Sequence, residues 1–315
     1  MIKYICMEQK AIFQTFALCK NYKGTKALDN VSMTIYEGDI YGFVGENGAG
    51  KTTLIRLATD LIHADGGEYS VFGVSSKSKD LPKAKKKFAA IVEAVAVNRG
   101  LTALENLKMQ CYIAGIKKSD EELTELIKDV GLDAESLKKK KVGGFSLGMR
   151  QRLGLAIALV SDPEFVLLDE PMNGLDPQGF VDMRETILRL NKKGVTFLIS
   201  SHILSELDKI CTRVGFLSHG KLLKELSIDE LHNMARKKIV IRVKNCDAVA
   251  KKLEKQFKIK ESKVEGDSFT IYDSLDINEV MAYLVTNKIK VEAIYSGEET
   301  IEDYYRQLMG GEVAR

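Results

Sequence analysis

A glycine-rich stretch at residues 45–52, GENGAGKT, combines residue types that bind a phosphate chain. It follows a short apolar segment that predicts a buried strand, and it opens a helical pattern, which is the context that this spacing requires. Glycines let backbone N–H groups approach phosphate oxygens, and a helix start carries about half a positive charge toward them. Lys51 is expected to reach the β and γ phosphates, and Thr52 to bind Mg²⁺. The stretch therefore predicts a nucleotide site.

The residues expected to contact the nucleotide in and after this stretch are Gly45, Glu46, Asn47, Gly48, Ala49, Gly50, Lys51, Thr52 and Thr53.

Two carboxylates follow a second apolar segment, FVLLDE at residues 165–170. Asp169 ends the expected strand and can complete the Mg²⁺ shell, and Glu170 is placed to orient or deprotonate a water as general base. A carboxylate pair after a strand is also a common surface feature. Together with the glycine-rich stretch, however, the pair indicates a site that hydrolyses a nucleoside triphosphate.

Residues 145–154, FSLGMRQRLG, predict a second helix start of the kind that binds anions. Ser146 supplies a hydroxyl, Gly148 lets backbone amides approach, and the helix start favours negative charge. This start lies far along the chain from the phosphate-binding stretch. The sequence by itself does not say which phosphate it serves.

The composition bounds the class of protein. The 315 residues are 45% apolar and 29% charged, and 47 Lys and Arg stand against 44 Asp and Glu, so no charge excess points to nucleic acid. The basic runs at residues 83–87 and 138–141 are expected to be solvated surface. No apolar run approaches the roughly 18 residues of a membrane span, and the first residues lack a signal-peptide core. We expect the chain to stay in the cytosol and to meet a membrane only through a partner.

The cysteines are scattered without paired spacing, which suits a reducing compartment and argues against a disulfide framework or a zinc site. They are Cys6, Cys19, Cys111, Cys211 and Cys246.

Alternating apolar strands and amphipathic helices predict an α/β core with a mostly parallel sheet. At its start we expect strands over 12–19 and 31–36, joined by a turn at 21–26. The helix after Lys51 should bury an apolar stripe that extends to Leu61. Between about 101 and 137 the pattern turns helical and charged. Two capping boxes are expected there, Thr102 with Glu105 and Ser119 with Glu122.

From Ile239 onward the order of elements reads strand, helix, two strands, helix, strand and a last helix. A β-α-β-β-α-β order is the ferredoxin-like pattern and predicts a small α+β domain. The expected domains are residues 12–235, with a helical subdomain at about 95–160, and residues 238–310.

These motifs, in this order, make the chain resemble the ATP-binding cassette (ABC) family over nearly all of residues 12–225. The resemblance rests on GENGAGKT (45–52), FSLGM (145–149), LLDEP (167–171), NGLDP (173–177) and SSH (200–202). It implies a P-loop NTPase fold, the nucleotide-binding domain of an ABC protein with its helical subdomain, and ATP and Mg²⁺ as ligands. It also implies a use for the second helix start. Two copies face each other head to tail, and each copy's Ser146, Leu147, Gly148 and Met149 complete the nucleotide site of the other.

Several single residues keep two interpretations. Tyr22 is either a turn aromatic or, as the resemblance implies, a ring that stacks on adenine. His202 either caps its segment or, at a strand end, contacts the γ-phosphate. Asp176 either caps a helix or turn or reaches across the dimer to the opposite site.

Two departures from the family pattern narrow the resemblance. Leu147 and Met149 replace a glycine and the usual glutamine of the signature, and Glu93 stands where the family normally carries glutamine. Glutamate keeps oxygens for metal or water but loses an amide donor and adds a charge. By analogy this loop faces the membrane subunit, although a lone surface glutamate is commonplace. The combination resembles the bacitracin-resistance and lantibiotic-immunity ATPases.

The predicted function is the ATPase subunit of a bacterial ABC exporter for antimicrobial peptides or drugs. It would form a homodimer and bind separately encoded membrane subunits at the cytoplasmic face of the cell membrane. Sodium or a lipid-like substrate remains an alternative. A soluble ABC ATPase that acts on ribosomes or nucleic acid is the alternative from another class. It is disfavoured by the single phosphate loop and by the lack of a sustained heptad run.

Overall fold

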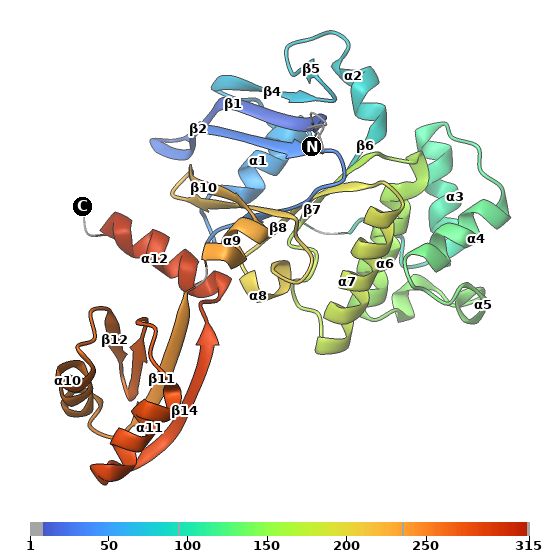
Figure 1. Cartoon of the computed structure of the whole chain (residues 1–315). Coiled ribbons are helices and arrows are strands. Elements are labelled where there is room, and N and C mark those ends of the chain that lie inside the picture. Colours follow the sequence, from blue (N-terminus) through green and yellow to red (C-terminus); the bar gives the residue numbers. More distant parts are fainter. Residues whose placement is uncertain (1–8, 94, 235, 314–315) are drawn as a thin grey trace, which may run out of the picture. The chain divides into compact units, whose positions relative to one another are not determined.

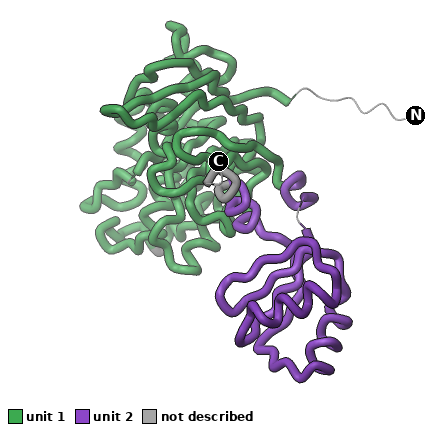
Figure 2. Tube along the Cα trace, turned by 90° about the vertical axis from the view of Figure 1, so that its left-hand side faces the viewer, with its two compact units in different colours: residues 1–228 green, residues 229–315 purple. Residues whose placement is uncertain are grey.

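The fold is that of a computed structural model, which describes residues 9–93, 95–234 and 236–313. Cys6 and most of the N-terminal segment examined for a signal peptide lie outside the described residues. The chain divides into two compact units, residues 1–228 and 229–315 (Figure 2). The expected domain boundary between residues 235 and 238 stays a prediction.

The first unit contains a four-stranded antiparallel sheet in the order β2-β1-β4-β5. Its strands are β1 (Ala11–Tyr22), β2 (Thr25–Tyr36), β4 (Gly66–Val71) and β5 (Val74–Ser75). The first two strands are longer than the sequence predicted, and the six-residue turn was wrong. Lys23 and Gly24, both with positive φ, turn the chain in two residues, as a tight hairpin requires.

A six-stranded sheet in the order β10-β9-β3-β8-β7-β6 forms the centre of this unit (Figure 1). All neighbouring pairs are parallel except β9 with β10, so the predicted mostly parallel sheet is confirmed. Parallel strands bring their carboxyl ends to one edge. The loops after β3, β7 and β8 therefore meet there. The strands are β3 (Ile40–Val44), β6 (Phe88–Ile91), β7 (Phe165–Asp169), β8 (Thr196–Ser201), β9 (Arg213–Ser218) and β10 (Lys221–Ser227).

Helix α1 (Lys51–Ala58) packs its apolar side chains into a core shared by both sheets. Leu54 and Ile55 are fully buried in this core beside Phe13 of β1 and Leu167 of β7. The stripe predicted to reach Leu61 was wrong at its end, because the helix stops at Ala58 and Leu61 is 63% exposed. Asp60 adopts a positive φ there and turns the chain out of the helix.

The helical region forms as predicted, and α3, α4 and α6 lie together at one side of the unit (Figure 1). Both capping boxes are present. The Thr102 hydroxyl accepts from the Glu105 N–H, the Ser119 hydroxyl accepts from the Glu122 N–H, and each glutamate bonds back to the cap N–H. The main helices are α3 (Ala103–Ala114), α4 (Asp120–Asp129), α6 (Leu147–Ala158) and α7 (Pro177–Lys192). Short helices are α2 (Leu81–Ala84), α5 (Ala134–Leu137) and α8 (Leu204–Leu207), and α9 (Ile228–Met234) spans the boundary between the two units.

The second unit contains one four-stranded antiparallel sheet in the order β12-β13-β11-β14. Its apolar core lies between this sheet and two helices, with Ile241, Phe269 and Leu284 fully buried. The element order matches the sequence expectation. The elements are β11 (Lys237–Val243), α10 (Cys246–Phe257), β12 (Ser262–Glu265), β13 (Ser268–Ile271), α11 (Ile277–Thr286), β14 (Val291–Glu298) and α12 (Ile301–Val313).

Within the described residues, no helix is both long and apolar enough to cross a membrane.

Candidate nucleotide-binding site

The loop between β3 and α1 is shaped by close backbone approaches. Gly50 has φ 113°, and a side chain there would lie 2.3 Å from the Ala27 carbonyl oxygen. A side chain at Gly45 would lie 2.5 Å from the Leu217 carbonyl oxygen. Only glycine fits at either position, and the loop is closed by a hydrogen bond from the Ala49 N–H to the Glu46 carbonyl oxygen at 3.1 Å.

Lys51 is 6% exposed, yet its ammonium group meets oxygen atoms on several sides. Its Nζ donates to the carbonyl oxygens of Gly45, at 2.6 Å, and Glu46, at 3.2 Å. It also lies 3.3 Å from Oε1 of Glu170. A buried ammonium group needs anionic or carbonyl partners. Lys51 is therefore placed to bind a phosphate group in place of the Glu170 carboxylate.

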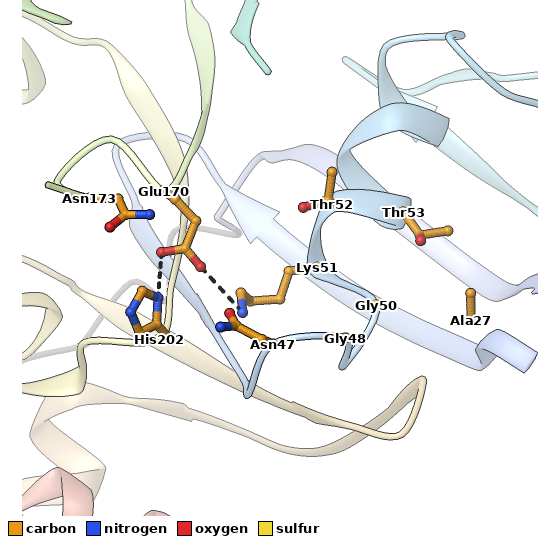
Figure 3. Close-up of a pocket in the computed structure, with 10 residues that line it drawn as sticks. All are labelled: Ala27, Asn47, Gly48, Gly50, Lys51, Thr52, Thr53, Glu170, Asn173 and His202. Carbon is orange, nitrogen blue, oxygen red and sulfur yellow. Dashed lines mark hydrogen bonds and ion pairs between the residues drawn. The ribbon is translucent and has the colours of Figure 1, made fainter. Parts of the chain in front are cut away.

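Glu170 joins the phosphate loop to the end of β8 (Figure 3). Its Oε2 lies 2.8 Å from Nδ1 of His202, while Oε1 faces Lys51. The backbone of Glu170 has φ 49°, a conformation that costs energy for a residue with a side chain. Its N–H donates to the carbonyl oxygen and the hydroxyl of Ser200 at 3.2 and 3.0 Å. These bonds hold the strained turn, and thereby aim the carboxylate at the pocket.

Asp169 ends β7 and is 5% exposed. The Ser200 hydroxyl donates to its Oδ1 at 2.6 Å, which fixes the carboxylate. Ser200 therefore orders both acidic residues, and sequence reasoning gave it no role beyond its place in SSH. A serine inside an apolar strand shows its partners only once the neighbouring strand is placed.

A pocket of about 420 Å³ lies over the phosphate loop (Figure 3). It is lined by Ala27, Asn47, Gly48, Gly50, Lys51, Thr52, Thr53, Glu170, Asn173 and His202. The pocket thus brings most of the predicted nucleotide residues together with Glu170, the candidate general base, and His202, the candidate γ-phosphate contact. Ala27 and Asn173 are additions. Asn173 begins the NGLDP motif but was assigned no contact.

A second pocket, of about 520 Å³, shares Thr52 and Glu170 with the first and adds Asp169 and Glu93. A hydroxyl and carboxylates are the hard oxygen donors that Mg²⁺ prefers, so these residues fit the ion. Among the described residues, no cluster of three or more His, Cys, Asp or Glu is arranged to hold a metal by itself.

The signature residues start α6 as predicted, because the Ser146 hydroxyl caps the helix by accepting from the Met149 N–H at 3.2 Å. Ser146 is exposed, and Leu147 is 40% exposed. Of the described residues, Leu147 lines the second pocket, whereas Ser146, Gly148 and Met149 are in the lining of neither pocket. That these residues bind the nucleotide of another copy stays a prediction.

Asp176 caps α7, since its Oδ1 accepts from the Gly179 N–H at 2.8 Å. This confirms the capping interpretation, and the contact across a dimer stays a prediction. The loop from Glu170 to Asp176 packs on α6. A methyl group of Leu147 lies 3.2 Å from where a side chain of Gly174 would begin. The Gln151 amide donates to the Asn173 carbonyl oxygen at 3.4 Å.

Two other predicted residues lie at the edges of the site. Tyr22 ends β1 and is 42% exposed, with the Lys20 ammonium 5.6 Å from its ring centre. It is not in the described lining of the first pocket, so adenine stacking stays a prediction. Glu93 follows β6 with φ 62° and pairs with Arg56 of α1. The sequence gave no signal for Arg56, because its partner is brought near only by the fold.

Comparison with known proteins identifies the family. Residues 28–173 match the ABC transporter family. The chain is 39% identical over 303 residues to the bacitracin transport ATP-binding protein BcrA of Bacillus licheniformis, covering 95% of this chain and 98% of that one. The chain belongs to the ABC transporter ATP-binding proteins. The resemblance in the sequence motifs is thereby confirmed, and the first unit is an ABC ATPase domain.

Other similarities agree with this family. The cassette is 37% identical over 217 residues to the lantibiotic transport ATP-binding protein SrtF of Streptococcus pyogenes, covering 69% of this chain and 91% of SrtF. Among solved structures, it is similar to the ADP conformation of MJ1267, an ATP-binding cassette of an ABC transporter, with a TM-score of 0.63 and 25% identity over 71% of this chain and 94% of that one. The dimeric, post-hydrolysis cassette MJ0796 with ADP and phosphate has a TM-score of 0.61 at 24% identity over 69% and 99% of the two chains. These structures share the fold of the first unit.

Proposed function

We propose that this ABC ATP-binding protein powers the export of a peptide antibiotic of the bacitracin or lantibiotic kind. The observation that carries the proposal is the extent of the similarity to BcrA. It covers 95% of the chain and therefore includes the second unit as well as the ATPase domain. Similarity to SrtF, a lantibiotic transport protein, supports the same class of substrate.

In the proposed hydrolysis site, the loop N–H groups and Lys51 bind the phosphate chain, and Glu170 orients and deprotonates the attacking water. His202 holds one oxygen of Glu170 and lies in the same pocket, where it can also reach the γ-phosphate. Thr52 and Asp169 would hold Mg²⁺, with Glu93 as a further oxygen donor. The ion, when bound, would neutralise charge that develops on the phosphate oxygens.

The proposed assembly is a head-to-tail pair in which Ser146 and Gly148 of each copy bind the nucleotide of the other. The exposed, capped start of α6 supports this, because the helix dipole at this end favours a bound anion. Ser146 and Gly148 do not line the first pocket of their own chain, so the anion would come from another copy. Separately encoded permease subunits would hold the pair at the cytoplasmic face of the membrane.

We also infer that the second unit is a ferredoxin-like accessory domain. Its β-α-β-β-α-β order and its antiparallel strand order β12-β13-β11-β14 support this assignment. We propose the domain limits expected from the sequence, 12–235 and 238–310, with a helical subdomain at about 95–160.

The test is resistance in a sensitive host. The chain is expressed together with a candidate polytopic membrane subunit, and inhibitory concentrations are measured for bacitracin, a lantibiotic and an unrelated drug. We expect a rise for one of the two peptide antibiotics that disappears with Glu170→Gln. Unchanged sensitivity to both peptides, with the two proteins co-purifying and hydrolysing ATP, would overturn the substrate class.

A further inference from the structure

Arg56 and Glu93 form an ion pair between α1 and the loop after β6. Arg56 stands four residues after Thr52, so the two side chains lie on one face of α1. The hydrogen bond with Glu93 raises the pKa of the Arg56 guanidinium above its ordinary value. The pair therefore connects the helix that begins at the phosphate loop to the Glu93 loop.

Glu93 adds a third carboxylate to a crowded region. Glu93, Asp169 and Glu170 all line the second pocket, and they also line a small cavity of about 30 Å³. A bound nucleotide would bring further negative charge to the same place. Like charges that line one pocket repel one another, and a cation that pairs with Glu93 opposes this repulsion.

Arg56 is the described cation that contacts Glu93 directly. Two further arginines, Arg99 and Arg150, line the second pocket, but within the described part of the chain neither forms an ion pair with Glu93, and Arg150 donates to the Phe145 carbonyl oxygen. Lys51, which lines the first pocket, faces Glu170 and the loop carbonyls. As a stabilising surface pair, Arg56 and Glu93 would contribute little, because their side chains are 41% and 57% exposed. The significance of the pair lies in its position beside the pocket.

We propose that Arg56 is a positioning residue of the nucleotide site. It holds the Glu93 carboxylate against α1 and cancels its charge, so that a glutamate at this position is compatible with tight binding of the magnesium–nucleotide complex. The inference rests on the proposed nucleotide site. It predicts that Arg56 is needed because Glu93 is present.

The test is a double-mutant cycle on the purified full-length chain. The dissociation constant for ATP in the presence of Mg²⁺ and the KM and kcat for its hydrolysis are measured for wild type, Arg56→Gln, Glu93→Gln and the double variant. We expect Arg56→Gln to weaken binding and raise KM about threefold to tenfold, with a smaller change in kcat, because one uncompensated charge remains near the phosphates. In the Glu93→Gln background the same Arg56 change should alter KM by less than about twofold.

Two further measurements separate charge from structure. Arg56→Lys keeps the charge and should recover most of the binding that Arg56→Gln loses. Higher salt should reduce the rise in KM caused by Arg56→Gln, because screening weakens interactions between exposed charges. Lys87→Gln is the matched control. Lys87 pairs with Glu164 at the opposite end of β6, also between exposed side chains, and its removal should leave KM unchanged.

If Arg56→Gln raised KM equally in the wild-type and Glu93→Gln backgrounds, the inference would be overturned. An equal rise in KM for Lys87→Gln would also overturn it. Because the cycle reads nucleotide binding, it stays informative if the chain does not confer antibiotic resistance. A wild type that does not bind ATP at all would contradict the proposed site itself.

Discussion

The Gln151 amide donates a 3.4 Å hydrogen bond to the Asn173 carbonyl oxygen, and so joins the helix that starts at Ser146 to the loop that starts at Glu170. Leu147 packs against Gly174 in the same contact. In one chain, therefore, the helix start proposed to serve another copy's nucleotide is attached to the loop that carries the proposed general base. A displacement of the Glu170 loop would therefore act directly on the start of α6 through these two contacts.

The shared site predicts that two inactive variants restore each other. Lys51→Ala damages a chain's own site, and Ser146→Arg damages the site that the chain completes in its partner. An equal mixture should regain about a quarter of wild-type ATPase activity, because half of the dimers are mixed and each has one intact site of two. The rate is measured after the two purified chains are mixed and allowed to exchange. If each site were complete within one chain, every site in the mixture would carry one lesion, and activity would stay near zero.

Glu170→Gln should abolish turnover while leaving ATP binding intact. The amide keeps the size of the side chain but cannot accept a proton from water, so kcat should fall by about a hundredfold or more. An ATP-dependent dimer should then persist in size-exclusion chromatography. Glu185→Gln, on the exposed side of α7, is the control and should behave as wild type. Normal ATPase activity in Glu170→Gln would remove Glu170 from the role of base.

Glu93→Gln should separate hydrolysis from export. Glu93 lies in the loop that the family resemblance places beside the membrane subunit, and its amide substitute keeps an oxygen for the metal. We expect a larger loss of antibiotic resistance than of basal ATPase activity, measured on the same cells and on protein purified from them. Losses of equal size in the two measurements would contradict a role in coupling.

The sequence predicted those parts of the fold and of the site that are local in the chain. The phosphate loop, the carboxylates that end β7 and both capping boxes each need only a few neighbouring residues, and all formed as expected. The predicted hairpin turn was too long because the turn propensity of a residue such as Asn21 does not show how far the two strands stay paired. In the structure Asn21 pairs with Lys26, and only Lys23 and Gly24 lie between the strands. Leu61 was misplaced because apolar periodicity continues past a residue, Asp60, whose backbone ends the helix.

Contacts between distant segments could not be predicted. Ser200 orders Asp169 and Glu170 from the neighbouring strand, and Gln151 reaches Asn173 from α6. Arg56 meets Glu93 only because α1 and the end of β6 lie close together. In each case a common polar residue acquires a specific partner from the packing of elements. Its type and its sequence neighbours carry no sign of this.

The second unit offers a prediction about pH. The Glu299 carboxylate is 6% exposed and accepts hydrogen bonds from Nε and a terminal nitrogen of Arg236, at 3.0 and 2.8 Å, and from the Gln307 amide at 2.6 Å. Burial by itself would raise the pKa of Glu299. The bonds from Arg236 and Gln307 outweigh it and hold the pKa below the ordinary 4.5. A depressed pKa means that the charged form stabilises the fold above 4.5, and that this stability is lost as pH falls through the lower, folded-state pKa.

Glu299→Gln should therefore lower the free energy of unfolding of this unit by about 1.5–3 kcal/mol at pH 7. Its deficit should shrink as the pH falls below 4.5, since protonation removes the same charge from wild type. The chain contains no tryptophan, so Tyr295→Trp on β14, half-exposed, provides a fluorescence reporter for urea unfolding of the second unit in the full-length protein. Glu292→Gln, an exposed change on the same strand, is the control and should show no such dependence on pH. A Glu299→Gln deficit that is constant from pH 7 to below 4.5 would show that the lost stability comes from packing and not from the charge.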